Sequence, residues 1–169
     1  MKPIAVVYYT RTGNTQTVAQ ELARRLSADA YAIQDVHSRR GSLGFVRALL
    51  EALYHRDVRI VAPDIAFGRY RTVVIATPVW ASNIAAPMRT WLTRHAAALP
   101  DVAFVCTYGG SGAQSVLQDL ADLVGKVPVA ELALRDAEIR LGKCGAKLDD
   151  FGRAVADAGS VSLGSEMPA

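Results

Sequence analysis

The sequence predicts a three-layer α/β domain, in which a doubly wound sheet of five parallel strands lies between two layers of helices. Short, continuous apolar runs alternate with segments of helical spacing five times along the chain. Continuous apolar runs of this length suit strands that are buried on both faces, as in parallel sheets. Parallel strands need crossover connections, and right-handed crossovers place helices on both faces of the sheet.

Three runs are the clearest strands, and they cover residues 4–10, 72–77 and 102–107. They are rich in Val, Ile, Tyr and Phe, whereas residues 30–34 and 127–134 are weaker candidates. We expect the strand order 2-1-3-4-5, because it places the most apolar runs, the first, third and fourth, at the centre of the sheet.

Five stripes of apolar residues at helical spacing predict the helices. The stripes are Val18, Leu22, Ala23 and Leu26; Val46, Leu49, Leu50 and Leu53; Ile84, Met88, Trp91 and Leu92; Val116, Leu120, Ala121 and Val124; and Leu148, Phe151, Val155 and Ala158. The less regular stretch at 38–67 predicts the second helix together with an excursion at one edge of the sheet.

The length and composition fit one domain over residues 1–169, with a small, polar tail at 159–169 that we expect to be frayed. No apolar run is long enough to span a bilayer and the N-terminus lacks the features of a signal peptide, so we expect a cytoplasmic protein without a membrane partner. Cys106 and Cys144 have the spacing of neither a disulfide framework nor a zinc site. The net charge of +3 comes without a concentrated basic stripe, which argues against nucleic-acid binding.

The expected strand order also predicts where a ligand binds. In open parallel sheets, ligands lie beyond the carboxyl ends of the strands, at the point where the strand order reverses. Here that point lies between the first and third strands. The loops that follow residues 9, 77 and 107 are therefore the candidate site.

The first loop runs directly from strand to helix and reads Thr10-Arg11-Thr12-Gly13-Asn14-Thr15. Gly13 permits a tight turn that exposes consecutive backbone N–H groups, and three threonine hydroxyls surround them at the positive end of the helix. This arrangement suits a phosphate dianion and needs no lysine. The alternative is that Thr12 only caps the helix, and the loop by itself does not decide between the two.

The second loop offers an aromatic plate and reads Thr77-Pro78-Val79-Trp80-Ala81-Ser82-Asn83-Ile84. Trp80 follows a buried strand closely, and backbone groups of the same loop are able to hydrogen-bond the edge of a heterocycle. A tryptophan that packs against a neighbouring helix is the alternative.

The third loop is rich in glycine and reads Thr107-Tyr108-Gly109-Gly110-Ser111-Gly112. Its glycines allow close approach of the backbone to a ligand, and Tyr108 offers a second aromatic face. It is a weak match to a dinucleotide-binding fingerprint, because it follows the fourth strand and residue 115 is Ser. A glycine loop without function is the alternative, but three unusual loops at one switch point together favour a ligand site.

These loops resemble those of the flavodoxin family and of the wider set of bacterial flavodoxin-like proteins and FMN-dependent reductases, over residues 4–158. The resemblance implies a flavodoxin-like fold and non-covalent binding of flavin mononucleotide (FMN). By position, it implies that the phosphate is held by Thr10, the backbone of Arg11, Thr12, Gly13, Asn14 and Thr15. It implies that the ring and the ribityl chain are lined by Pro78, Val79, Trp80, Asn83, Tyr108, Gly109, Gly110 and Gly112.

The chain departs from electron-carrier flavodoxins in two respects. Such carriers are typically acidic, whereas this sequence has a pI of about 9.0. Their third loop usually carries a Gly-Asp pair before a stacking tyrosine, whereas here the Asp is absent and Tyr108 precedes the glycines. These departures weaken the assignment as a carrier and leave the cofactor assignment unchanged.

Three functions remain open at this point. The first is an FMN-binding electron-transfer protein, which exchanges electrons with a redox partner protein or a small-molecule acceptor. The second is an FMN-dependent NAD(P)H:quinone-type oxidoreductase, and the third is a non-catalytic binding domain. Intact hydroxyls in the first loop argue against the third. The sequence holds no nucleophile–base pair, so we assign no catalytic residue and no metal; we expect His37, His55 and His95 at surface or capping positions and Cys106 in the core.

We favour electron transfer, because residues 77–84 and 107–115 contain no Lys, Arg or His. A shuttle keeps positive charge away from the flavin ring, which disfavours uptake of the second electron. Exposed charges farther than about 8–10 Å are largely screened at physiological salt, so local neutrality should outweigh the basic surface. The lack of a recognisable nicotinamide-binding segment points the same way.

Overall fold

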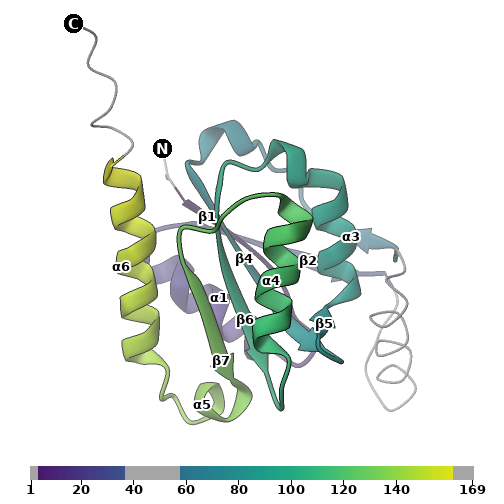
Figure 1. The fold of residues 1–169 in the computed structure, drawn as a ribbon, viewed down its shortest axis with the longest axis vertical. Coiled ribbons are helices and arrows are strands. Elements are labelled where there is room, and N and C mark those ends of the chain that lie inside the picture. Colours follow the sequence, from purple (N-terminus) through teal and green to yellow (C-terminus); the bar gives the residue numbers. More distant parts are fainter. Residues whose placement is uncertain (1–3, 37–57, 162–169) are drawn as a thin grey trace, which may run out of the picture.

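The computed structural model describes residues 4–36 and 58–161, and these form three layers around a central parallel sheet (Figure 1). The five parallel strands follow the order β2-β1-β4-β6-β7, which confirms the predicted order 2-1-3-4-5. Their bounds are β1 Ile4–Tyr9, β2 Asp29–Asp35, β4 Thr72–Trp80, β6 Asp101–Tyr108 and β7 Glu131–Arg135.

Two short antiparallel strands were missed by the sequence analysis. The strand β3, Ile60–Val61, extends the sheet beyond β2, and β5, Asn83–Ile84, pairs with the end of β4. Strands of two residues are too short for any periodicity, so the sequence carried no signal for them. The predicted start of the last strand was also wrong: Val127 is 91% exposed, and β7 begins only at Glu131.

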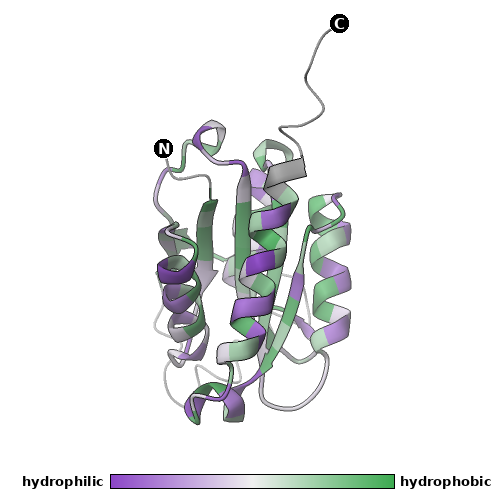
Figure 2. Cartoon of the chain, turned by 90° about the vertical axis from the view of Figure 1, so that its left-hand side faces the viewer, coloured by the Kyte–Doolittle hydropathy of each residue, from purple (hydrophilic) through white to green (hydrophobic). Residues whose placement is uncertain are grey.

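The helices cover both faces of the sheet. One face carries α1 (Asn14–Arg25), α5 (Asp136–Arg140) and α6 (Gly145–Val161), and the other carries α3 (Ala86–His95) and α4 (Ala113–Val124). Two 3-10 turns, Phe67–Arg69 and Ala96–Ala98, complete the described elements. Hydropathy follows the layers: the strands are apolar, and the exposed helix faces carry most of the polar residues (Figure 2).

The predicted apolar stripes account for four of these helices, except that Ile84 of the third stripe lies in β5, before α3 begins at Ala86. The helix α5 carried no stripe. The second predicted helix, with Val46, Leu49, Leu50 and Leu53, lies outside the described residues. The helix α6 continues to Val161, into the predicted tail, because a helix does not have to end where its buried stripe ends. Within the part of the chain that the structure describes, no helix is both long and apolar enough to cross a membrane.

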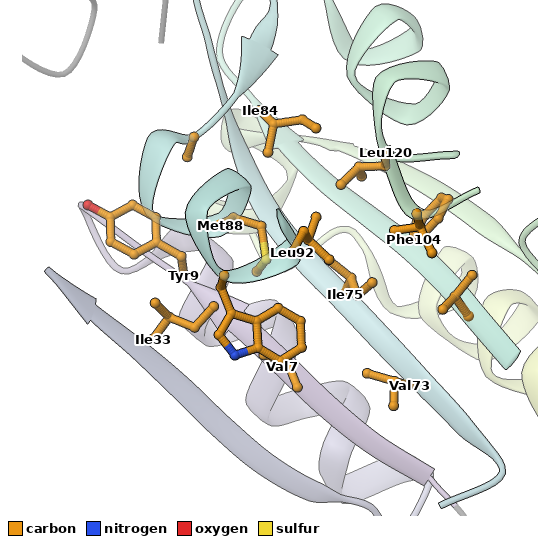
Figure 3. Close-up of a cluster of buried hydrophobic side chains, with 14 of the residues drawn as sticks. Val7, Tyr9, Ile33, Val73, Ile75, Ile84, Met88, Leu92, Phe104 and Leu120 are labelled. Carbon is orange, nitrogen blue, oxygen red and sulfur yellow. The ribbon is translucent and has the colours of Figure 1, made fainter. Parts of the chain in front are cut away.

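The core consists of two clusters separated by the sheet. Alternate residues of β1 point to opposite faces: Val7 packs with Met88 and Leu92 of α3, whereas Val6 packs with Leu22 of α1. Figure 3 shows the first cluster, in which the side chains of α3 and of the strands meet. Every residue of β1 is buried, as a strand covered on both faces requires.

The end of β4 turns back tightly and packs against the loop that precedes α4. The turn is made by Ala81 and Ser82, both with positive φ (48° and 59°), a conformation that hairpin turns of two residues require. Gly112, at the start of α4, has φ 91°, and a Cβ atom added there would lie 2.4 Å from the Oγ of Ser82. Gly112 therefore allows the hairpin and the third loop to touch.

We expect Gly112→Ala to lower the free energy of unfolding by about 2 kcal/mol or more, because a left-handed Ala costs about 1–2 kcal/mol before the clash with Ser82 is counted. Urea denaturation of the FMN-free chain measures this. The matched control is Gly110→Ala in the same loop, where an added Cβ meets open space; it should change stability by less than about 0.5 kcal/mol. Equal effects of the two substitutions would contradict the packing role of Gly112.

Candidate functional site

A cleft of about 740 Å³ lies at the carboxyl ends of the strands, where the strand order reverses between β1 and β4. All three predicted loops contribute to it, together with a fourth segment from α5. Its lining residues are Arg11, Thr12, Asn14, Thr15, Pro78, Val79, Trp80, Ala81, Ser82, Thr107, Tyr108, Gly109, Gly110, Ser111, Asp136 and Arg140. Most of the residues predicted from the sequence are therefore brought together; Thr10, Gly13, Asn83 and Gly112 are not part of the lining.

The first loop presents an uncapped helix end to the cleft. Gly13, the residue before α1, has φ 100° and donates its N–H to Oγ1 of Thr10 at 3.0 Å, so both residues shape the turn. No side-chain hydrogen bond caps α1, and its first turn carries no acidic residue. The interpretation of Thr12 as a helix cap is therefore wrong. The N–H groups of the first turn have no partner within the helix, and the helix dipole favours an anion beside them.

A buried hydrogen bond fastens the first loop to the strand below the third loop. Oγ1 of Thr15 lies 2.8 Å from Oγ1 of Thr107, although 92 residues separate them. Both side chains are almost fully buried and line the floor of the cleft. The Thr15 hydroxyl thus already has a partner inside the protein, and its backbone N–H, in the first turn of α1, remains directed along the helix axis.

The second predicted loop is a continuation of the strand. Pro78, Val79 and Trp80 belong to β4, and the chain turns back only at Ala81 and Ser82. Trp80 is 9% exposed and meets the edge of Tyr9, with ring centroids 5.5 Å apart. The side chain of Asn83 donates to the carbonyl oxygen of Ala81 at 2.7 Å and so braces the turn. The hairpin forms one wall of the cleft.

The third loop forms the opposite wall. Tyr108 is half-buried, while Gly109 and Gly110 are exposed and line the opening with their backbone. Gly112 lies behind this wall, where it packs against Ser82. Two aromatic side chains, Trp80 and Tyr108, thus line the cleft from neighbouring strands.

The charged residues of α5 are the part of the site that the sequence analysis missed. Asp136 and Arg140 line the cleft, and the guanidinium of Arg135 lies over the ring of Tyr108, 5.7 Å from its centroid. The cleft is therefore not free of charge near loops two and three, which corrects the argument from local neutrality. The fifth strand also ends at this edge of the sheet, but it lies away from the switch point, so the rule that singled out the three loops did not single out these residues.

Cys106 lies in the core, as expected. His95 is half-buried at the end of α3 and is the N-cap residue of the 3-10 turn Ala96–Ala98, which fits the expected surface or capping position. Cys106 is fully buried, and burial raises the pKa of its thiol to about 12, so it is not a thiolate at neutral pH. His95 packs against Phe67 and Trp91 with ring centroids 5.7 Å and 4.9 Å away, and burial lowers its pKa. His37 and His55 lie outside the described residues.

Comparison with solved structures places this chain among proteins of the flavodoxin-like fold. A flavoprotein of Lactobacillus acidophilus NCFM in complex with FMN is 18% identical, with a TM-score of 0.68 over 83% of this chain and 97% of that one. A proposed flavoprotein of Bacteroides uniformis ATCC 8492 is 18% identical, with a TM-score of 0.70 over 85% and 97%. The two-electron reduced flavodoxin of Megasphaera elsdenii is 16% identical, with a TM-score of 0.54 over 91% and 98%.

At these identities the likeness establishes the fold, so the expected flavodoxin-like architecture is confirmed. No family model matches the sequence. No curated protein matches it either.

We expect Thr15→Val and Thr107→Val each to lower the free energy of unfolding by about 1–3 kcal/mol, because each leaves the other hydroxyl buried without its partner. The double variant should lower the free energy of unfolding by less than the sum of the two single effects, since it removes both hydroxyls. Urea denaturation of the four proteins of this cycle measures the coupling. Strict additivity would mean that the two hydroxyls do not stabilise one another.

Proposed function

We propose that this chain binds FMN non-covalently in the cleft and functions in electron transfer. The observation that carries the proposal is the uncapped N-terminus of α1 at the floor of a cleft whose walls carry Trp80 and Tyr108. A terminal phosphate fits the helix end, and a flat ring system fits the space between the walls. The FMN complex of the similar Lactobacillus acidophilus flavoprotein supports the choice of ligand.

The phosphate is assigned to the first loop. Backbone N–H groups of Asn14 and Thr15 in the first turn of α1 would donate to it, and the exposed hydroxyl of Thr12 would add a further hydrogen bond. Arg11 lines the same end of the cleft and contributes positive charge. Thr10 acts through the turn, because its hydroxyl accepts the N–H of Gly13.

The ring is assigned to the walls. FMN, when bound, supplies the redox chemistry, so the chain has to bind it, orient it and set its electrostatic surroundings. The hairpin at Ala81 and Ser82 and the backbone of Gly109 and Gly110 offer polar groups to the edge of a ring. Trp80 is packed against Tyr9 and contributes from the hairpin side, while Tyr108 contributes from the third loop.

Electron transfer is favoured over an NAD(P)H-dependent reductase by the charge of the cleft. Asp136 and Arg140, four residues apart on α5, bring one negative and one positive side chain to the same side of it. The two side chains are opposite in sign, so α5 itself adds no net charge to the lining of the cleft. Weak net charge near the ring fits a protein that exchanges single electrons.

We expect Thr12→Val to weaken the binding of FMN by about 10- to 150-fold, because a hydrogen bond to a charged acceptor contributes about 1.5–3 kcal/mol. The affinity for riboflavin, which lacks the phosphate, should fall by less than about 3-fold by the same reasoning. Titration of flavin fluorescence measures both. The control is Thr93→Val on the exposed side of α3, which should leave both affinities unchanged.

Equal weakening of FMN and riboflavin would show that Thr12 does not contact the phosphate. Uptake of FAD in preference to FMN, or no uptake of any flavin by the FMN-free chain, would contradict the cofactor assignment itself.

We expect anaerobic dithionite titration of the FMN-loaded protein to proceed in two resolved one-electron stages, with only slow oxidation of NADH and NADPH by the protein alone. The physical reason is the small net charge beside the ring, which gives little support to the anion that the second electron creates. Absorbance spectra recorded during the titration separate the stages. A single two-electron stage together with rapid NAD(P)H turnover against a quinone would make the reductase function correct.

A further inference from the structure

A small cationic surface borders the cleft on the side of α5, at the end of the molecule where this helix lies beneath β7 (Figure 1). We define this α5 surface by three exposed cations, Arg135, Arg140 and Lys143, together with Leu141, which is 67% exposed. It is continuous with the cleft, because Arg140 lines it and Arg135 lies over Tyr108. Whatever docks here lies directly beside the opening.

Arg135 and Leu141 flank α5 at its two ends, and both side chains are exposed. Arg135 is at the N-cap of α5, the helix end at which a positive charge is unfavourable. Leu141 leaves most of its side chain in water at the C-cap, where its backbone N–H already bonds the carbonyl oxygen of Ala137. Its side chain is therefore available as an apolar contact beside the cations.

Positive charge exceeds negative charge over residues 135–143, where Arg135, Arg140 and Lys143 stand beside two acids, Asp136 and Glu138. Among the described residues, no carboxylate forms an ion pair with Arg135, Arg140 or Lys143. Glu138 pairs with Lys147 and also accepts the backbone N–H of Arg135, so it offsets part of the charge there. Asp149 pairs with Arg25, and Asp150 pairs with Arg153. Asp136, which is half-buried and lines the cleft, is the nearest acid without such a partner among the described residues.

We propose that the α5 surface is the docking site of an electron-transfer protein with an acidic surface. This inference rests on the proposed function and names its partner. Three exposed cations with one exposed apolar side chain match the small, weakly held complexes of redox proteins, which bury less than about 1,200 Å² and depend on electrostatic steering. Leu141 supplies an apolar contact, and the cations orient the partner over the cleft.

The composition of the α5 surface favours a protein partner over the other acidic macromolecules. Nucleic-acid binding calls for a longer basic groove with aromatic residues on which bases stack. Anchoring on an anionic membrane calls for a cluster of about 4–8 cations or an amphipathic helix. None of the four residues that define the α5 surface is aromatic, and the neighbouring ring of Tyr108 lies under Arg135.

The test is the binding of an acidic [2Fe–2S] ferredoxin, used as the probe, to the full-length chain in its FMN-free form. We expect Arg135→Glu/Lys143→Glu to weaken this binding about 10-fold or more at an ionic strength of about 20 mM, and the difference to shrink to about 2-fold in 0.5 M NaCl. Calorimetry gives the affinities. Amide chemical shifts should change over residues 135–143 of the wild-type chain. Neither substituted residue lines the cleft.

The matched control is Arg94→Glu/Lys126→Glu, which changes the net charge equally at exposed positions at the ends of α3 and α4. It should weaken ferredoxin binding by no more than about 2-fold, because these charges are remote from the patch and screened. A basic c-type cytochrome should show the opposite response and bind the Arg135→Glu/Lys143→Glu variant more tightly than the wild type.

Leu141→Ser tests the apolar contact separately. It should weaken ferredoxin binding to a similar extent at low and at high salt, because burial of apolar surface is not screened. The control is Val127→Ser, at a residue that is 91% exposed near the opposite end of β7, and it should have no effect.

The proposal is overturned if ferredoxin does not bind at low salt, or if Arg135→Glu/Lys143→Glu and Arg94→Glu/Lys126→Glu weaken ferredoxin binding equally. It is overturned as well if the amide chemical shifts change outside residues 135–143. It is also overturned if duplex DNA or vesicles containing phosphatidylserine bind more tightly than ferredoxin and lose affinity in Arg135→Glu/Lys143→Glu. Because the probe is bound to the FMN-free chain, these results are independent of the FMN titrations, and each proposal fails separately.

Discussion

The structure depends on one constraint. Strands that are buried on both faces need a layer of helices on each side, and the helical crossovers that supply these layers make the strands run in the same direction. In β1 this constraint is visible residue by residue, since Val6 packs with α1 and Val7 packs with α3. All five carboxyl ends then lie along one edge. The edge opens between β1 and β4, because the connections from these strands leave toward opposite faces.

Polar and steric contacts at this edge turn separate loops into one cleft. The hydroxyl pair of Thr15 and Thr107 holds the first loop against β6, and Gly112 allows the β4–β5 hairpin to approach the third loop. The α1 end is left without a side-chain cap within this framework. A helix end prepared in this way binds an anion without having to reorganise.

The electrostatics of the site come from a helix outside the three loops. Arg135, Asp136 and Arg140 enter through α5, and they give the cleft a cationic border while leaving little net charge inside it. In our proposals this segment has two roles: Asp136 and Arg140 affect the surroundings of a bound ring, and Leu141 and Lys143, which follow α5, contact a partner. Proposed cofactor and proposed partner meet at α5.

The sequence by itself determined the layers, the parallel order and the edge that carries the site, because continuous apolar runs and helical stripes report burial directly. It also located the first loop of the cleft, since Gly13 and its threonines are contiguous in the chain. Tertiary structure alone decided the rest. The hydroxyl pair of Thr15 and Thr107 joins residues 92 positions apart, and Asp136 and Arg140 reach the cleft only because β7 ends at the same edge as β1. Such contacts depend on how strands are stacked in space, and no local pattern of residues records them.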